Sequence, residues 1–286
     1  AASDVYKRQV DNDNPEAFRA AVTEKTRAIF VESLANPGGV IVDLEAIAKI
    51  AQEAEVPLIV DNTMATPWLC RPFEWGADLV VHSTTKFLSG QGNAMGGIVI
   101  DSGRFPWFGN AKYPSLSEPC PDYNGLTFAE TFGDMAFTLY SHAVSLRDLG
   151  CTQSPMNAWI TLNGVETLPL RMERHVENAQ KVAGFLQQHP SVEWVSYAGL
   201  SSSPYYQLAQ KYLQGKAGSV FTFGIRGGYE SGLRLLEKVE LFSHVSNIGD
   251  SRSLILHPAS TTHRQLSDEQ RHTAGAGPEV IRLSVG

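Results

Sequence analysis

The chain has 286 residues, of which 43% are hydrophobic, and a formal net charge of −7 at pH 7. This length is enough for one large hydrophobic core and a smaller second domain. The acidic balance provides no basic surface for nucleic acid or for an acidic membrane, and no apolar run approaches the length of a bilayer-spanning helix. The three cysteines are odd in number and far apart, so they favour neither a disulfide framework nor a zinc site. We therefore expect a globular protein of the cytoplasm.

Residues 1–9 differ in character from the rest of the chain. They match, in frame, the translation of a transposon-end adapter used in sequencing libraries, so we exclude them from the fold prediction. Val10 is then expected to be an interior residue of a longer gene. The segment 280–286 agrees with this expectation, because it reads as a strand that lacks the structure which should follow it.

Strands and helices are expected to alternate in the first part of the chain. Asp43 suits the N-cap of a helix whose apolar residues fall on one face. Alternation of this kind predicts βαβ units in a parallel sheet with right-handed crossovers. Such a sheet would place Asn36, Asp61 and Lys86 along one edge. The expected elements are a helix over 14–22, a strand over 28–32, a turn-rich loop over 33–39, a helix over 43–54, strands that begin at Leu58 and Leu79, and a strand over 96–100.

The second part of the chain shows a different pattern. Residues 105–125 are irregular and too long for a simple connector, which is typical of a functional loop. We place a domain boundary near a long helix, with one domain over residues 10–168 and a C-terminal domain over 169–286. Helices are expected over 131–149, 158–163, 170–189 and 229–238, and strands over 192–197, 220–225 and 241–245.

The strongest chemical signal lies where two apolar strands end. One strand runs into Asp61, and the next runs into Ser83, Thr85 and Lys86. Ligands of α/β sheets gather at such strand ends, and a lysine near apolar surface and another cation can act as an amine nucleophile toward an aldehyde. Taken singly, Asp61 as a helix cap and Lys86 as a surface residue are the simpler interpretations. Together, a lysine for a Schiff base, an aspartate for a pyridinium nitrogen and hydroxyls for a phosphate match the requirements of pyridoxal phosphate (PLP).

Other residues with chemical potential give weaker signals. The eight histidines include His257 and His263, but neither forms an i, i+4 arrangement with an acidic partner, so we expect no metal site. His82 is expected to be a packed core residue. The glycine-rich segment 90–97 matches no nucleotide-binding pattern and is interpreted as a tight turn that lets backbone approach the lysine. Arg282 could clamp a substrate carboxylate or form a surface salt bridge.

Five motifs, in chain order, resemble the Cys/Met-metabolism PLP enzymes. The resemblance runs from Val10 to the C-terminus and implies a type I aminotransferase-like α/β fold, with a mostly parallel sheet flanked by helices and a smaller C-terminal α/β domain. The motifs are Val31-Glu32-Ser33 with Asn36-Pro37, Val60-Asp61-Asn62-Thr63, His82-Ser83-Thr84-Thr85-Lys86, His257-Pro258-Ala259-Ser260-Thr261-Thr262-His263, and Ile281-Arg282-Leu283-Ser284-Val285-Gly286.

The resemblance also implies roles for individual residues. Lys86 would bind PLP through a Schiff base and Asp61 would pair with the pyridinium nitrogen. Ser83 and Thr85 would contact the phosphate. Arg282 would hold the α-carboxylate of an amino-acid substrate. Asn36 and the Asn247-Ile248-Gly249 turn would lie beside it, and the full-length protein would form a homo-oligomer, a dimer of dimers.

Within the family, the segment from Asp101 to Leu126 is similar to an insertion typical of its sulfhydrylase branch. That branch makes homocysteine and acetate from O-acetylhomoserine and sulfide, and this is the reaction we expect. The alternatives are a cystathionine γ-synthase, a methionine γ-lyase or a catalytically silent PLP-fold binding protein. Succinyl or phospho leaving groups stay open. Because family motifs that precede Val10 are missing, we expect the isolated chain to bind PLP weakly and to have little activity.

Overall fold

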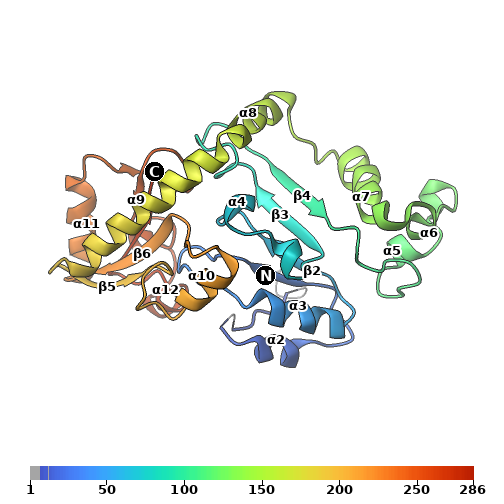
Figure 1. Cartoon of the computed structure of the whole chain (residues 1–286), viewed down its shortest axis with the longest axis horizontal. Coiled ribbons are helices and arrows are strands. Elements are labelled where there is room, and N and C mark those ends of the chain that lie inside the picture. The colour runs from blue at the N-terminus through green and yellow to red at the C-terminus, as the bar shows by residue number, and fades with distance from the viewer. Residues whose placement is uncertain (1–6, 12) are drawn as a thin grey trace.

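Two β-sheets and a long helix organise the chain (Figure 1). The computed structural model describes residues 7–11 and 13–286, so most of the segment assigned to adapter sequence lies outside the described residues. Helix α9, Leu168–Gln188, begins near the first sheet and runs along the second. The predicted boundary between residues 168 and 169 falls at the start of this helix and stays a prediction.

The first sheet has the strand order β1-β2-β3-β4. Its strands are β1 (Ile29–Glu32), β2 (Leu58–Asp61), β3 (Leu79–Ser83) and β4 (Gly97–Asp101). The first three are parallel, as the βαβ pattern predicts, with helix α3 (Leu44–Glu53) between β1 and β2. The prediction was wrong for β4, which is antiparallel to β3. Residues 84–96 contain no crossover helix, so the chain simply reverses its direction.

Short helices complete this part of the chain. Helix α2 (Pro15–Ala21) is capped by the side chain of Asn14, and Asp43 caps α3 by accepting a hydrogen bond from the backbone N–H of Ala46, as predicted. Helix α4 (Thr66–Leu69) and the 3-10 turn η1 (Pro72–Trp75) connect β2 to β3.

The segment between the sheets forms a separate aromatic cluster that projects from the body of the molecule (Figure 1). The single helix expected over 131–149 is broken, because Gly133 adopts a positive φ and the later residues form a wide π-helical turn. The elements are α5 (Pro114–Ser117), η2 (Pro121–Tyr123), α6 (Phe128–Phe132), η3 (Gly133–Met135), α7 (Ala136–Tyr140), η4 (Ser141–Asp148) and α8 (Pro155–Glu166).

The second sheet has the order β5-β6-β9-β8-β7 and is antiparallel except between β7 and β8. The strand expected over 241–245 is shorter in the structure, where only β7 forms, and the three-residue strand β8 was not predicted. The strands are β5 (Val192–Ser196), β6 (Val220–Ile225), β7 (Ser243–His244), β8 (Leu254–Leu256) and β9 (Val280–Ser284). The other elements are α10 (Tyr206–Tyr212), α11 (Gly228–Lys238), η5 (Pro258–Ser260) and α12 (Asp268–Thr273).

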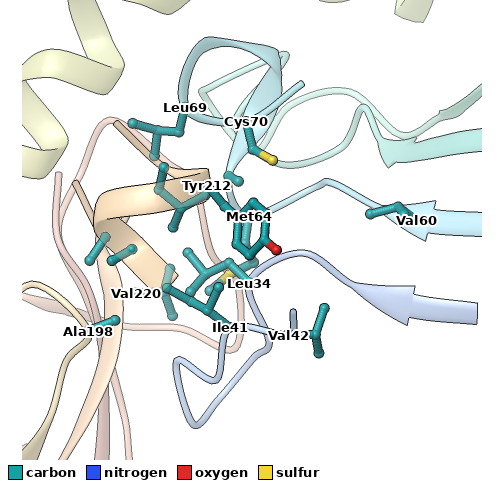
Figure 2. Packing of buried hydrophobic residues seen from close by; sticks show 14 of the residues in the cluster. Leu34, Ile41, Val42, Val60, Met64, Leu69, Cys70, Ala198, Tyr212 and Val220 are labelled. Atoms are coloured by element: carbon teal, nitrogen blue, oxygen red, sulfur yellow. The ribbon is translucent and has the colours of Figure 1, made fainter. Parts of the chain in front are cut away.

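One continuous hydrophobic core joins the two sheets (Figure 2). Val60 of β2 and Leu34 of the loop after β1 belong to the same cluster as Tyr212 of α10 and Val220 of β6. Each fully buried side chain of this size contributes about 1.5–3 kcal/mol, so the two parts of the chain are firmly packed together, as expected. Among the described residues, no helix has the length and apolar character needed to cross a membrane.

Candidate active site

The carboxyl ends of β1, β2 and β3 meet at one edge of the first sheet. Glu32 of β1 lies opposite Asp61 of β2, and Asp61 lies opposite Val81 of β3. Ser83 ends β3, and Lys86 follows in the next turn. Asn36 lies in the loop after β1. The structure therefore brings the strand-end residues that the sequence singled out to the same edge.

A tight turn after β3 carries Lys86. The backbone N–H of Lys86 donates to the carbonyl of Ser83 at 3.2 Å, and the N–H of Gly90 donates to the carbonyl of Lys86 at 2.9 Å. Gly90 has a φ of +77°, a backbone conformation that glycine adopts without a steric penalty. The turn thus fixes the lysine backbone between the end of the sheet and the glycine-rich loop.

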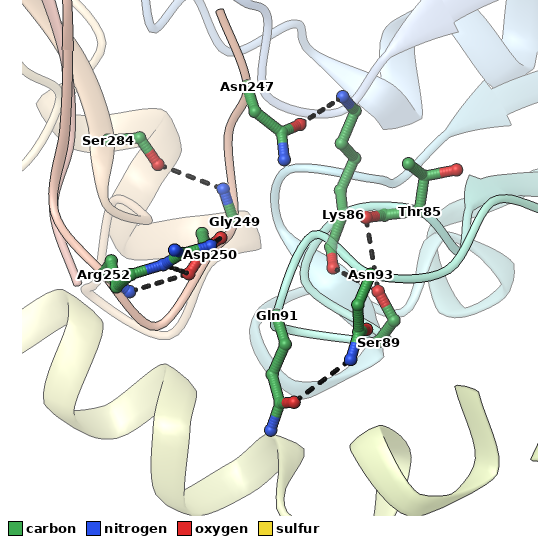
Figure 3. Close-up of polar contacts among 10 residues, drawn as sticks. All are labelled: Thr85, Lys86, Ser89, Gln91, Asn93, Asn247, Gly249, Asp250, Arg252 and Ser284. Carbon is green, nitrogen blue, oxygen red and sulfur yellow. Dashed lines mark hydrogen bonds and ion pairs between the residues drawn. The ribbon is translucent and has the colours of Figure 1, made fainter. Parts of the chain in front are cut away.

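The amine of Lys86 makes a hydrogen bond across the molecule. Its Nζ donates to Oδ1 of Asn247 at 2.6 Å (Figure 3). Burial lowers the pKa of Lys86, and the nearby cation of Arg282 lowers it further. Both effects raise the fraction of neutral amine at a given pH, which is the form that attacks an aldehyde or accepts a proton.

Arg282 lies in the middle of β9 and completes this cluster. One guanidinium nitrogen, Nη1, donates to Oδ1 of Asn36 at 3.4 Å, and Nη2 donates to the carbonyl of Asn247 at 3.2 Å. Burial lowers the pKa of Arg282. Its partners in this network are neutral amides, so the guanidinium keeps its full charge for an anionic ligand such as a carboxylate.

Asp61, Ser83 and Thr85 lie on the sheet side of the cluster. Thr63, to which the sequence analysis gave no role, connects the first two. Its N–H donates to Asp61 Oδ1 at 2.9 Å, and its Oγ1 accepts from the N–H of Ser83 at 2.8 Å. The Thr85 hydroxyl donates to the carbonyl of Gly96 at 3.2 Å and accepts from the N–H of Gly96 at 3.1 Å. Thr85 is thereby tied to the glycine-rich loop.

Two further titratable groups border the strand ends. Glu32 accepts a hydrogen bond from the N–H of Asn36 at 3.1 Å, and burial raises its pKa, with the charge of Asp61 acting in the same direction. His82 is a buried core residue, as predicted, and burial lowers its pKa although the charge of Asp61 opposes this shift. Its Nδ1 atom has no hydrogen-bond partner. A neutral imidazole therefore packs behind the site.

The glycine-rich loop lies directly against the cluster. Gly92 has a φ of +64°, and a Cβ atom there would lie 3.0 Å from Oδ2 of Asp250 and 3.2 Å from Nδ2 of Asn247. Only a residue without a side chain allows this approach. The backbone N–H of Ser251 also donates to the carbonyl of Gly90 at 2.9 Å. The loop thus closes against the Asn247 turn, in agreement with its interpretation as a close approach of backbone to the lysine.

This donor set fits PLP better than a metal ion. The cluster offers an amine of lowered pKa for an aldehyde, a carboxylate for a ring nitrogen and hydroxyls for a phosphate. In the described part of the chain, no group of three or more His, Cys, Asp or Glu residues could hold a metal. Two surface hollows of roughly 400 Å³, one against α11 and one beside residues 106–112, contain none of these residues. The site is therefore identified by its side-chain chemistry.

Comparisons with known proteins give the same picture. The sequence profile of the Cys/Met metabolism PLP-dependent enzymes matches residues 2–286. An O-acetyl-L-homoserine sulfhydrylase of Leptospira meyeri is 51% identical, over 97% of this chain and 64% of the relative. O-acetyl-L-homoserine sulfhydrylase 1 of Thermus thermophilus is 50% identical, over 96% of this chain and 65% of the relative. The chain thus spans slightly less than two thirds of the length of these relatives.

A solved structure shares the fold. The crystal structure of a candidate O-acetylhomoserine (thiol)-lyase from Campylobacter jejuni, which contains N'-pyridoxyl-lysine-5'-monophosphate, superposes with a TM-score of 0.93 and 41% identity, over 98% of this chain and 66% of that chain. The fold class expected from the sequence is therefore confirmed. The match of the family profile over nearly the whole sequence, together with relatives at half identity, means that the chain belongs to the Cys/Met metabolism PLP-dependent enzyme family.

Proposed function

We propose that this chain carries the cofactor-binding and substrate-binding residues of an enzyme that converts O-acetyl-L-homoserine and sulfide to L-homocysteine and acetate. The observation that carries the proposal is the half-buried Lys86 amine, which donates a hydrogen bond to Asn247 and lies close to the cation of Arg282. It occurs in a chain about half identical to two O-acetyl-L-homoserine sulfhydrylases.

The cofactor would be held by four residues at the strand ends. Lys86 would bond to the aldehyde carbon and Asp61 would pair with the ring nitrogen. Ser83 and Thr85 would donate hydrogen bonds to the phosphate, with Thr85 exchanging its bond to Gly96 for one to a phosphate oxygen. When bound, PLP supplies an electron sink for the charge that develops at the α-carbon of the substrate.

The substrate would be oriented by the residues around Arg282. The guanidinium would form a bidentate pair with the α-carboxylate, and the amides of Asn36 and Asn247 already hold that guanidinium in place. In the free protein, the charge of Arg282 lowers the pKa of Lys86. A bound carboxylate would neutralise that charge. Substrate binding would therefore make the Lys86 amine more basic when a base is needed.

Lys86 would then act as the general base and acid of the reaction, once the amino group of the substrate has replaced Nζ at the aldehyde carbon and freed it. Its Nζ would take the proton from the α-carbon and move protons along the substrate. The bond between the γ-carbon and the acetyl oxygen would break, releasing acetate, and sulfide would form a new carbon–sulfur bond at the γ-carbon. Return of the proton from Nζ to the α-carbon would complete homocysteine.

The proposal is tested by measuring homocysteine formation from O-acetylhomoserine and sulfide, with Lys86→Ala as the blank. Because the chain covers 64% of the Leptospira meyeri relative, the assay is run on this chain and on a version lengthened with the residues that complete that relative. We expect product from the lengthened protein and much less from the chain alone.

Other outcomes would assign the protein elsewhere. Product with cysteine in place of sulfide would favour a cystathionine γ-synthase, and release of an α-keto acid without an acceptor would favour a methionine γ-lyase. If neither product nor lysine-bound PLP is detected, the protein would be assigned as catalytically silent. O-succinylhomoserine and O-phosphohomoserine are included in the assay to identify the leaving group.

We further propose that the full-length protein is a cytoplasmic homo-oligomer, a dimer of dimers. Large apolar side chains on α8, including Trp159 and Leu162, are exposed in the isolated chain, and exposed apolar patches often mark protein interfaces. Light scattering coupled to size-exclusion chromatography gives the assembly directly. A monomer at all concentrations of the lengthened protein would reject this part of the proposal.

A further inference from the structure

Arg171 of α9 contacts the turn that carries Lys86. Its Nη1 donates to the carbonyl of Phe87 at 2.8 Å and its Nη2 to the carbonyl of Leu88 at 3.4 Å. The same guanidinium donates from Nη2 to the carbonyl of Gly164 at 2.7 Å and from Nε to Oγ1 of Thr167 at 3.1 Å. One side chain thus connects the two residues after Lys86 to the elbow between α8 and α9.

Two glycines allow this elbow to dock so closely. A Cβ atom at Gly164 would lie 2.3 Å from the carbonyl oxygen of Leu88 and 2.5 Å from that of Ser89. At Gly90, which has a positive φ, a Cβ atom would lie 2.4 Å from Nη1 of Arg171. Any side chain at these positions would push the elbow and the lysine turn apart. The backbone of α8 therefore packs directly on the turn.

The half-buried guanidinium of Arg171 is bound by uncharged groups. Burial lowers its pKa, and no charged group contributes to that shift. Its partners are carbonyls and one hydroxyl, which have no charge to compensate a half-buried cation. The desolvation of this cation is therefore not offset by an ion pair. Such an arrangement is typical of a contact that fixes local geometry at a site.

The next turns of α9 hold the strand that carries Arg282. Nδ1 of His175 lies 2.6 Å from the carbonyl oxygen of Val285, and Nδ2 of Asn178 donates to the carbonyl of Gly286 at 2.8 Å. The His175 ring also packs edge-on against Phe87, with centroids 5.5 Å apart. Residues of α9 therefore contact both the turn after Lys86 and the end of β9.

We propose that Arg171 is a positioning residue for Lys86: by holding the carbonyls of Phe87 and Leu88 against α9, it fixes the lysine amine at its distance from Asn247 and Arg282. This inference rests on the proposed function, because it concerns the geometry of the same lysine. Arg171 touches neither the amine nor the Arg282 cluster, so it acts only through the backbone of the turn.

The test titrates the lengthened protein used in the homocysteine assay with PLP. The absorbance of the lysine-bound cofactor is then measured as a function of pH. Arg171→Met removes the donors. Arg174→Met is the matched control, because Arg174 lies one turn further on α9, is exposed and pairs with Glu177 on the same helix. Arg171→Lys retains the charge and some donors and is expected to rescue part of the effect.

We expect Arg171→Met to weaken PLP affinity roughly tenfold or more, the loss that corresponds to removing hydrogen bonds from a charged donor. The pH midpoint of the absorbance should also move upward, since a displaced Lys86 amine would lie farther from the Arg282 cation. A role confined to general stability would lower the melting temperature without moving this midpoint.

A second pair of variants applies if Arg171→Met does not fold. Gly164→Ala keeps every charge but pushes the elbow away from Leu88. Gly184→Ala in α9 adds a methyl group that, apart from its chain neighbours and the backbone of its own helix, would have no atom within 4 Å. PLP affinity and midpoint equal to those of Arg174→Met and Gly184→Ala would overturn the inference. If the unsubstituted lengthened protein shows no Lys86-dependent absorbance, the proposed function fails and the inference with it, so the two failures are distinguishable.

Discussion

The two sheets contribute to the site in different ways. In the first sheet, every candidate residue lies at the carboxyl end of a parallel strand or just after it, as Asp61 and Lys86 do. In the second sheet, Arg282 projects from the middle of a central antiparallel strand, between Thr222 of β6 and Leu256 of β8. A strand-end position follows from topology, whereas a mid-strand arginine depends on which face of the strand meets the first sheet.

The difference teaches where the chemistry and the recognition reside. The first sheet supplies the amine, the carboxylate and the hydroxyls proposed to hold the cofactor. The second sheet supplies Arg282, and the turn between its strands β7 and β8 supplies Asn247; these two residues reach across to Asn36 and Lys86. Substitutions in the first sheet should therefore abolish reactivity, and substitutions in the second should weaken binding and retune the lysine.

The largest effect is expected for Lys86→Ala. Removal of the amine eliminates both the bond to the cofactor and the proton carrier, so turnover should fall at least roughly 10²- to 10⁴-fold, the range supplied by a positioned acid–base group. Homocysteine formation measures this, with Lys49→Ala on the exposed side of α3 as the control. Equal activity in the two variants would remove Lys86 from the mechanism.

The second effect concerns Arg282→Met. Loss of a buried charged partner for the substrate carboxylate costs about 2–5 kcal/mol, so KM should rise on the order of 10²-fold. Because the Arg282 cation lowers the pKa of Lys86, its removal should also shift the pH profile to higher pH. The exposed Arg226→Met variant in the same part of the chain provides the control. An unchanged KM would contradict the carboxylate role.

A smaller effect is expected for Asn247→Ala. This change removes the acceptor 2.6 Å from the Lys86 amine but leaves the backbone carbonyl that binds Arg282. Loss of one hydrogen bond from a charged donor should lower kcat/KM roughly tenfold. Steady-state kinetics measure it, and a loss as large as that of Arg282→Met would contradict a role limited to this one hydrogen bond.

The smallest effect is on the pH dependence of stability. Burial lowers the pKa of His82 in the first sheet and of His175 and His257 in the second part. These histidines take up protons near pH 6.5 in the unfolded chain and only at lower pH in the folded chain. Their contribution to the free energy of unfolding is therefore fully present above about pH 6.5 and is lost as the pH falls below it. Urea unfolding at pH 7.5 and 5.5 measures the change.

The carboxyl groups of Glu32 and Asp78 act in the opposite direction. Burial raises the pKa of each, so they favour the folded state as the pH falls toward their ordinary values near 4. The measurement therefore stops at pH 5.5, where the histidines dominate. A urea midpoint that is equal or higher at pH 5.5 would contradict the assignment of neutral buried imidazoles.

Local patterns were sufficient to predict much of the first sheet and its site. Asp43 as a helix cap and the strands that run into Asp61 and Lys86 follow from hydrophobic periodicity and from residue type, which act over a few positions. The antiparallel direction of β4 and the three-residue strand β8 could not be predicted in this way. Both depend on partners that lie elsewhere in the chain.

The same limit applies to the residues that support the site. Lys86 and Asn247 are 161 positions apart, and Arg171 and Phe87 are 84 positions apart. Asn247 was assigned from the family resemblance, since nothing in its own neighbourhood indicates a partner for the lysine. Arg171 resembles any other arginine of an amphipathic helix. Only the packing of α9 on the lysine turn distinguishes it.

The most direct test of the account is to mix the lengthened protein with PLP, reduce the mixture with borohydride and map the labelled lysines by mass spectrometry. The account predicts that label concentrates on the peptide containing Lys86 at PLP concentrations that leave exposed lysines such as Lys49 unlabelled, because burial and the Arg282 cation keep the Lys86 amine reactive. Label spread equally over exposed lysines, with none on Lys86, would contradict it.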